Sequence, residues 1–226
     1  MLLNEFYGIE ECKLTLIYNG LIDQAIFLDE VERMQRKRDL FFGEGEKLIL
    51  FVGRLDDIKG VDYLIEAFAK VIKKSSNTRL LIVGDGNYSR YLQMSADIWS
   101  RITFIGKISK QKLYEFYQIA DVGVMPSFHE QCRYVAIEMM MHGLPLIITN
   151  TTGLSEMIHH QNVECRLILK EDQNELRLSV EELSKCLLKI VTDDCWAREV
   201  GKLNRCRYKD AFSLEKMRMA FESFYS

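Results

Sequence analysis

The sequence contains little that would indicate a metal site, a membrane span or a nucleic-acid surface. Its six cysteines show no CxxC spacing, which argues against a zinc site or a thioredoxin-type redox pair. No apolar stretch approaches the roughly 18 residues of a bilayer span, and no basic segment with a long apolar run opens the chain. The formal net charge is only −3, so no global field favours nucleic acid or anionic lipid. We expect a protein of the reducing cytoplasm.

Markers of internal boundaries are scarce as well. The chain has only two prolines, and we find neither a repeat nor a low-complexity linker. Its 226 residues, 48% of them hydrophobic, suffice for a packed core in one large domain or two small ones.

The middle of the chain alternates short β-rich runs with longer amphipathic patterns. Runs that are apolar on consecutive residues, separated by helical patterns, are typical of a parallel sheet covered on both faces. The sequence therefore predicts an α/β fold with a doubly wound, Rossmann-like parallel sheet. The predicted strands span residues 47–52, 79–83, 101–105, 121–125 and 145–149, with a weaker one at 165–169, and the predicted helices 59–74, 88–98, 109–119 and 132–142.

The two ends of the chain follow other patterns. Near the start, "KLTLIYNGLID" is compatible with a strand and a turn, and "FLDEVERMQRKRDLFF" with a charged helix. After about residue 178 only helical patterns follow, and we expect this tail to pack against the helical layer of the sheet.

Two loops that follow predicted strands carry residues suited to binding phosphate. "GRLDDIKG" (53–60) brings Arg54 and Lys59 to the start of a helix, where backbone N–H groups and the helix dipole also attract anions. The alternative is a surface loop with solvated charges, since the Walker pattern is absent. "GDGN" (84–87) offers Gly84 and Gly86 for a tight turn, but the third glycine of a dinucleotide fingerprint is missing.

Two glutamates stand around the fourth predicted loop. Glu130 belongs to the loop, and Glu138 falls on the second turn of the next helix, which is otherwise apolar nearly all round. A buried ionised carboxylate without partners is costly, so Glu138 needs one. The two hydroxyls of a ribose suit it, and an arginine or a backbone group is the structural alternative. His129 and His142 are interpreted as surface or capping residues, because no metal spacing supports them.

Several segments together resemble the retaining GT-B glycosyltransferases of family 4. They are "FVGRLDDIKGVDYLIEAF" (51–68), "RLLIVGDG" (79–86), "ITFIGKIS" (102–109), "YQIADVGVMPSFHE" (117–130), "EQCRYVAIEMMMHGLPLIIT" (130–149) and "GLSEMI" (153–158). Their order and intervals agree with the family over roughly residues 13–200. The joint occurrence is far more specific than any single motif.

The resemblance implies roles for individual residues. Arg54 and Lys59 match the basic pair that holds the diphosphate of a nucleotide-sugar donor, while Glu130 and Glu138 match the paired glutamates near the transferred sugar and the ribose. Catalytic roles fall to Glu130, Arg54 and Lys59. No DxD motif is present, so fixed cations and a helix N-terminus are expected in place of a metal, and no cofactor is expected. Donor contacts are implied at Gly53, Arg54, Lys59, Gly86, Ile108, Glu130, Cys132, Arg133, Tyr134, Val135 and Glu138.

Two local departures from the family pattern stand out. Gln131, Cys132 and Arg133 occupy positions where the family has glycine, an aromatic residue and glycine, and only Gly153 remains of the glycine pair after the fifth strand. The larger side chains are expected to alter the pocket for the donor sugar.

The extent of the resemblance implies one half of a GT-B enzyme. "LIYNGLID" (16–23) resembles the connector that opens the second domain, so an acceptor domain is expected to be missing and the fragment to be poorly active alone. The implied division is a connector and N-terminal helix (1–40), a nucleotide-sugar-binding domain (41–205) and a C-terminal helix (206–226) that reaches toward the absent domain.

The expected partner is a nucleotide sugar, linked to UDP, GDP or ADP, from which a hexosyl group is transferred in polysaccharide biosynthesis. The full-length enzyme is expected in the cytoplasm or at the inner membrane face, with no transmembrane segment and no nucleic-acid partner. Two alternatives stay open at the level of sequence: a dinucleotide-dependent oxidoreductase with the same sheet, and a non-catalytic nucleotide-binding or protein-interaction module derived from such a domain.

Overall fold

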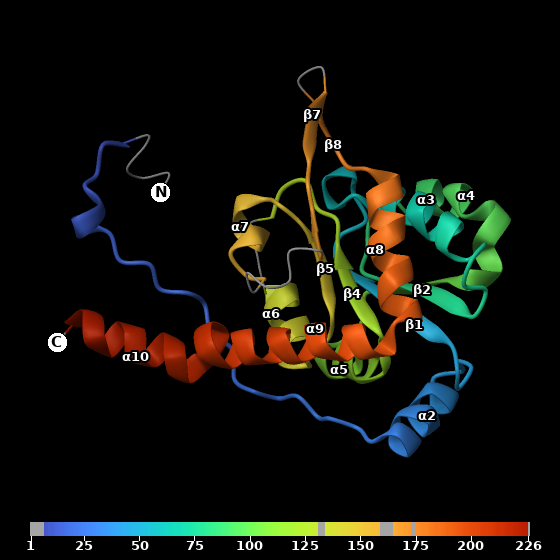
Figure 1. Cartoon of the computed structure of the whole chain (residues 1–226), viewed down its shortest axis with the longest axis horizontal. Coiled ribbons are helices and arrows are strands. Elements are labelled where there is room, and N and C mark those ends of the chain that lie inside the picture. Colours follow the sequence, from blue (N-terminus) through green and yellow to red (C-terminus); the bar gives the residue numbers. More distant parts are fainter. Residues whose placement is uncertain (1–6, 131–133, 159–164, 173–174, 226) are drawn as a thin grey trace.

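A six-stranded parallel sheet forms the centre of the protein (Figure 1). The computed structural model describes residues 7–130, 134–158, 165–172 and 175–225. The strand order is β3-β2-β1-β4-β5-β6, and every neighbouring pair is parallel. The five stronger predicted strands are confirmed to within one residue at either end. The strands are β1 (Lys47–Val52), β2 (Thr78–Val83), β3 (Ile102–Gly106), β4 (Val122–Met125), β5 (Leu146–Thr149) and the short β6 (Arg166–Leu167).

Helices cover both faces of the sheet because the direction of winding reverses. The chain moves from β1 outward to β3 and then returns to β4 on the other side of β1. Right-handed crossovers therefore put the first helices on one face and the later ones on the other. The first group is α3 (Val61–Val71), α4 (Tyr88–Met94) and the 3₁₀ segment η3 (Ala96–Arg101), and the second is α5 (Lys110–Ile119) and α6 (Tyr134–Met141).

Burial of the strands explains their sequence. Leu48, Ile49 and Leu50 in β1 are all fully buried, as expected for a strand covered on both faces. The helix predicted at 88–98 is shorter than expected: the segment divides into α4 and η3 at Ser95, whose hydroxyl donates to the Leu92 carbonyl. Side-chain to backbone bonds of this kind compete with helix continuation.

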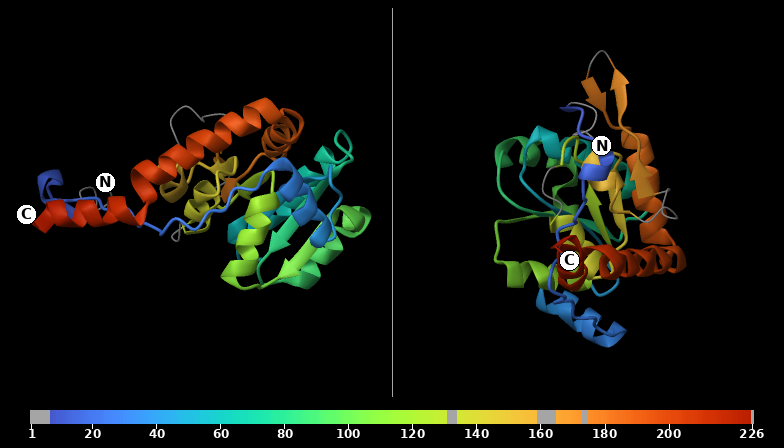
Figure 2. Two further views of the ribbon diagram at one scale, coloured as in Figure 1. Left: turned by 90° about the horizontal axis from the view of Figure 1, so that it is seen from below. Right: turned by 90° about the vertical axis from the view of Figure 1, so that its left-hand side faces the viewer.

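The C-terminal part is helical, as predicted. Helix α8 (Val180–Thr192) packs on α3, and α9 (Asp194–Arg207) packs on α6. A π-helical turn, η5 (Tyr208–Phe212), leads into α10 (Leu214–Tyr225). No residue of α10 is buried, and the helix extends away from the sheet on the same side as the N-terminal segment (Figures 1 and 2).

The N-terminal segment runs as an extended chain rather than a strand. After the 3₁₀ turn η1 (Glu11–Lys13), only Leu21 pairs with another segment, in a single bridge to Ser213. The predicted charged helix is confirmed as α2 (Glu30–Asp39), which begins with a capping box formed by Asp29 and Glu32.

Three short elements were not predicted from the sequence. They are α7 (Thr152–Ser155) and the antiparallel pair β7 (Lys170–Asp172) and β8 (Glu175–Arg177). Every residue of β7 and β8 is exposed, so the pair lacks the apolar alternation that identifies a strand. The hairpin projects beyond the carboxyl end of the sheet (Figure 1).

Candidate functional site

The candidate site lies at the carboxyl edge of the sheet, between β1 and β4. This is the point where the strand order reverses, and in open α/β sheets ligands bind in the crevice at such a switch point. The loops after the two strands are joined directly: the Phe128 N–H donates to the Ile58 carbonyl at 2.8 Å, and the rings of Tyr63 and Phe128 pack edge to face at 5.3 Å. The motifs at 53–60 and 126–130 therefore lie side by side at this edge.

An ion pair spans this switch point. Lys59 belongs to the 3₁₀ turn η2 (Asp57–Lys59), and its Nζ lies 2.6 Å from Glu130 Oε2. The two side chains are only 16% and 4% exposed, respectively. The Ser127 hydroxyl also donates to Glu130 Oε2, at 3.4 Å. Two residues that were singled out from different motifs, 71 positions apart in the chain, thus meet in one place.

Gly60 makes this close approach possible. Its φ is +64°, and a Cβ placed there would lie 2.3 Å from the Pro126 carbonyl oxygen. A side chain would therefore separate the two loops or break the turn. Gly60 also occupies the N-cap position of α3 without any side-chain cap, so the first N–H groups of that helix are not capped by a side chain. Together with Lys59, these N–H groups are of the kind that favour an anion.

Arg54 takes a different position from Lys59. Its side chain is 75% exposed, and its guanidinium lies 3.2 Å from Asp56 Oδ2. Gly53 beside it is half-buried, and its N–H donates to the Val83 carbonyl at 3.0 Å. The two cations of the predicted phosphate cradle are thus on one loop but engaged by different carboxylates.

The glycine loops after β2 and β3 continue the same edge. The Gly84 N–H donates to the Gly106 carbonyl at 3.0 Å, and Gly86 pairs with Leu55 in an isolated bridge. Both Gly84 and Gly86 have positive φ with no room for a Cβ, which explains their residue type. Ile108 is half-buried against the core. The segments at 84–86 and 106–108 therefore lie at the same edge, on the β2 and β3 side of the switch point.

Glu138 is buried on α6, on its second turn as predicted. Its Oε2 accepts a hydrogen bond from the Tyr117 hydroxyl at 3.1 Å, and its Oε1 lies 3.2 Å from Lys110 Nζ. The predicted need for a partner is confirmed, but the partners are a tyrosine and a lysine of α5 rather than an arginine or a backbone group. Neither residue was singled out from the sequence as a partner of Glu138. The helical stripe 110, 114, 117 was the available signal, because these positions share one face of α5.

The first turn of α6 carries two further predicted contacts. Tyr134 is 42% exposed, and Val135 is partly buried against the core. Cys132 and Arg133 lie outside the described residues, so their predicted contacts stay predictions.

Burial fixes the protonation of the groups around Glu138. Desolvation raises the pKa of Tyr117 well above its usual range, so the hydroxyl stays protonated and donates. A hydrogen bond with Tyr114 is the main cause that raises the pKa of Lys110, with Glu138 adding to it. His142 proves buried rather than exposed, and its Nδ1 lies 2.8 Å from the Glu138 carbonyl oxygen, as a C-terminal cap of α6 would. Burial lowers the pKa of His142.

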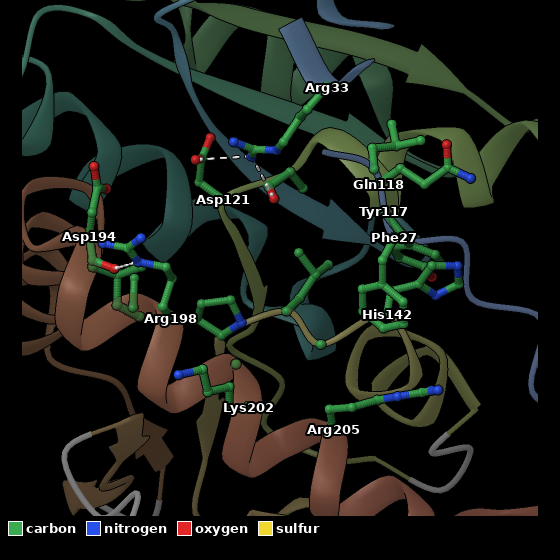
Figure 3. Close-up of a pocket in the computed structure, with 18 of the residues that line it drawn as sticks. Phe27, Arg33, Tyr117, Gln118, Asp121, His142, Asp194, Arg198, Lys202 and Arg205 are labelled. Atoms are coloured by element: carbon green, nitrogen blue, oxygen red, sulfur yellow. Dashed lines mark hydrogen bonds and ion pairs between the residues drawn. The ribbon is translucent and has the colours of Figure 1, made fainter. Parts of the chain in front are cut away.

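A cavity of about 860 Å³ lies at the opposite, amino edge of the sheet (Figure 3). Lys47, Asp121 and Pro145, at the starts of β1, β4 and β5, line it together with α9 and the N-terminal segment. Arg33 pairs with Asp121 at 3.0 Å in its wall. None of the predicted site residues lines this cavity. The cavity is therefore separate from the predicted site residues, although Tyr117 and His142 of the cluster around Glu138 line it.

The described part of the chain contains no group of three or more His, Cys, Asp or Glu side chains arranged to hold a metal ion. Within those same residues, no helix combines the length and apolar character needed to cross a bilayer.

A doubly wound parallel sheet with helices on both faces defines a Rossmann-like domain of the kind that forms half of a GT-B glycosyltransferase. The sequence model described as "Glycosyl transferases group 1" matches residues 46–186. The chain belongs to this family of glycosyltransferases, and the domain corresponds to the C-terminal one.

Known relatives agree with this membership. An uncharacterized glycosyltransferase of Methanocaldococcus jannaschii is 34% identical over 160 residues, which are 69% of this chain and 41% of the relative. The C-terminal domain of a group 1 glycosyl transferase from Francisella tularensis is similar in structure, with a TM-score of 0.72, 19% identity, and coverage of 86% of this chain and all of that domain. HepE of Anabaena, solved with UDP and glucose, gives a TM-score of 0.75 at 17% identity, covering 94% of this chain and 56% of HepE. The chain spans about half the length of the curated relatives it matches.

Proposed function

We propose that this chain is the donor domain of a retaining, metal-independent hexosyltransferase and binds a nucleotide-diphospho-sugar at the carboxyl edge between β1 and β4. The observation that carries the proposal is the part-buried pair of Lys59 and Glu130 at the switch point of the sheet. An ammonium group and an uncapped helix start suit a diphosphate, and the adjoining carboxylate suits the transferred sugar.

The arrangement also suggests how the site changes when the donor binds. Glu130 Oε2 lies 2.6 Å from Lys59 Nζ. A donor diphosphate would share that ammonium group, and Arg54 is free to swing toward it because its side chain is 75% exposed. The leaving diphosphate would then be stabilised by fixed cations and the start of α3 instead of a divalent ion.

Ribose binding falls to Glu138. Its carboxylate pairs with Lys110 at the start of α5, the helix that follows the segment 106–108 that we propose contacts the base. A carboxylate accepts hydrogen bonds from two vicinal hydroxyls through its two oxygens. UDP is the first nucleotide to test, because HepE was solved with UDP.

Transfer itself would require an acceptor domain in the whole protein. We propose that residues 41–205 form the donor-binding unit, residues 1–40 the connector and 206–226 a helix that contacts the acceptor domain. Retention of configuration at the transferred sugar, the choice of hexose and the choice of acceptor all concern the activity of the whole protein.

Calorimetric titration with UDP, GDP and ADP, free and as sugar conjugates, tests donor binding. We expect a heat of binding with one of these nucleotides, unchanged by EDTA. The affinity should fall at least about tenfold in Glu138→Ala and in Lys59→Ala. Arg54→Ala is expected to have a smaller effect, because this side chain must leave Asp56 to reach the ligand. Lys202→Ala, which removes a 70% exposed lysine at the amino edge, is the matched control. The proposal is overturned if none of the nucleotides gives a heat of binding at millimolar concentration.

A further inference from the structure

The two oxygens of the Glu138 carboxylate have partners of different kinds. Oε2 accepts from the hydroxyl of Tyr117, a residue that is only 1% exposed. Oε1 pairs with Lys110, whose side chain is 55% exposed and sits on a flexible four-carbon stem. One partner is thus fixed within the protein, and the other can be exchanged for a ligand.

Packing holds the Tyr117 hydroxyl in place. The ring lies 5.8 Å from the Tyr114 ring and 5.1 Å from the His142 ring, centre to centre. His142 in turn contacts the carbonyl of Glu138, so the carboxylate and its donor are held by the same cluster. Because burial keeps the phenol protonated, Tyr117 acts as a donor throughout the neutral range.

This geometry restricts the carboxylate. The terminal torsion of a glutamate is broad and roughly two-fold, so an untethered carboxylate samples many orientations. A hydrogen bond from a fixed donor to Oε2 selects one plane and directs Oε1 to the side of Lys110. Each carboxylate oxygen has two acceptor sites, so Oε2 retains one beyond the tyrosine bond.

We propose that Tyr117 is a positioning residue that orients the Glu138 carboxylate for the two hydroxyls of a nucleotide ribose, and that Lys110 occupies Oε1 until the ribose replaces it. The assignment rests on the proposed function, because it concerns the same nucleotide site. Tyr117 makes no contact with the ligand itself and acts only through Glu138.

Titration with UDP and with 2′,3′-dideoxy-UDP isolates the ribose contribution. We expect Tyr117→Phe to lower the affinity for UDP about tenfold, as loss of a hydrogen bond to a charged group does, and to change that for the dideoxy analogue less than twofold. The ratio of the two affinities therefore falls toward one. Lys110→Met is expected not to lower the ratio, because the lysine gives way to the ribose.

Tyr208→Phe is the matched control. Tyr208 is fully buried, and its hydroxyl donates to the Leu21 carbonyl at 2.9 Å, away from the carboxyl edge. Its removal costs a comparable buried hydrogen bond and should leave the ratio at the wild-type value. Should Tyr117→Phe melt below the assay temperature, the titrations of the variant and the wild type are both repeated at a temperature where the variant is folded. The same loss of ratio is then expected.

The outcomes distinguish failure of the positioning role from failure of the proposed function. A wild-type protein that binds UDP, with an unchanged ratio in folded Tyr117→Phe, overturns the positioning role and leaves the proposed function standing. A wild-type protein that binds no nucleoside diphosphate overturns both.

Discussion

Removing one partner of the pair of Lys59 and Glu130 should destabilise the fold far more than breaking an exposed ion pair of similar length, because the other charge is left largely buried without its counter-ion. The atoms of this pair are 2.6 Å apart with side chains 16% and 4% exposed, whereas Lys70 and Glu181 are 2.8 Å apart with side chains 50% and 55% exposed. Exposed pairs contribute about 0.5 kcal/mol, because water screens the charges. Removing one partner of a buried pair costs about 3 to 5 kcal/mol.

Lys59→Met tests this difference while it keeps the apolar stem. Residual exposure and the Ser127 hydroxyl bring the expected loss to the lower end, about 3 kcal/mol. For a chain of this size that lowers the melting temperature by roughly 6 to 12 °C. Lys70→Met should lower it by less than about 2 °C, since the exposed pair is worth about 0.5 kcal/mol. Scanning calorimetry of both variants at pH 7 measures the two shifts. Equal, small shifts would refute the argument from burial.

Two further predictions concern the loops and the pH dependence. Gly84→Ala should lower the free energy of unfolding strongly, because φ is +142° and the new Cβ would lie 1.7 Å from the Gly53 carbonyl oxygen. Urea unfolding measures the loss. The control Gly45→Ala should change it little, since the nearest neighbour of its Cβ would lie at 3.4 Å. Burial lowers the pKa of His142 from 6.5, so below about pH 6.5 the unfolded chain binds more protons and stability falls as the pH drops. Melting temperatures at pH 7.5 and 5.5 should differ less in His142→Asn than in the wild type. An equal difference in both would exclude His142 as a cause.

The sheet was readable from the sequence because its strands are buried on both faces. Runs such as 47–52 and 145–149 are apolar on consecutive residues, and this composition leaves few alternatives. The pair β7 and β8 gave no such signal, since all its side chains are exposed. The segment 13–23 carries the composition of a strand but finds only one bridge partner, Ser213, so tertiary context overrides its propensity.

The candidate site was predictable in part for a related reason. Motifs at the ends of parallel strands meet at one edge, which is why Lys59 and Glu130, assigned to the donor site from separate motifs, lie together. Individual side-chain pairings depend on helix rotation and rotamers, which a single sequence does not specify. Neither Lys110 nor Tyr117, 28 and 21 positions before Glu138, was therefore identified as its partner.

The location of nucleotide binding tests the account most directly. Backbone amide chemical shifts of the labelled protein during titration with UDP, GDP and ADP report it residue by residue. We predict that the binding nucleotide shifts amides within 53–60, 84–86, 106–110 and 134–138. Shifts confined to the amino-edge cavity, around Phe27, Arg198 and Lys202, would contradict the placement of the donor site between β1 and β4.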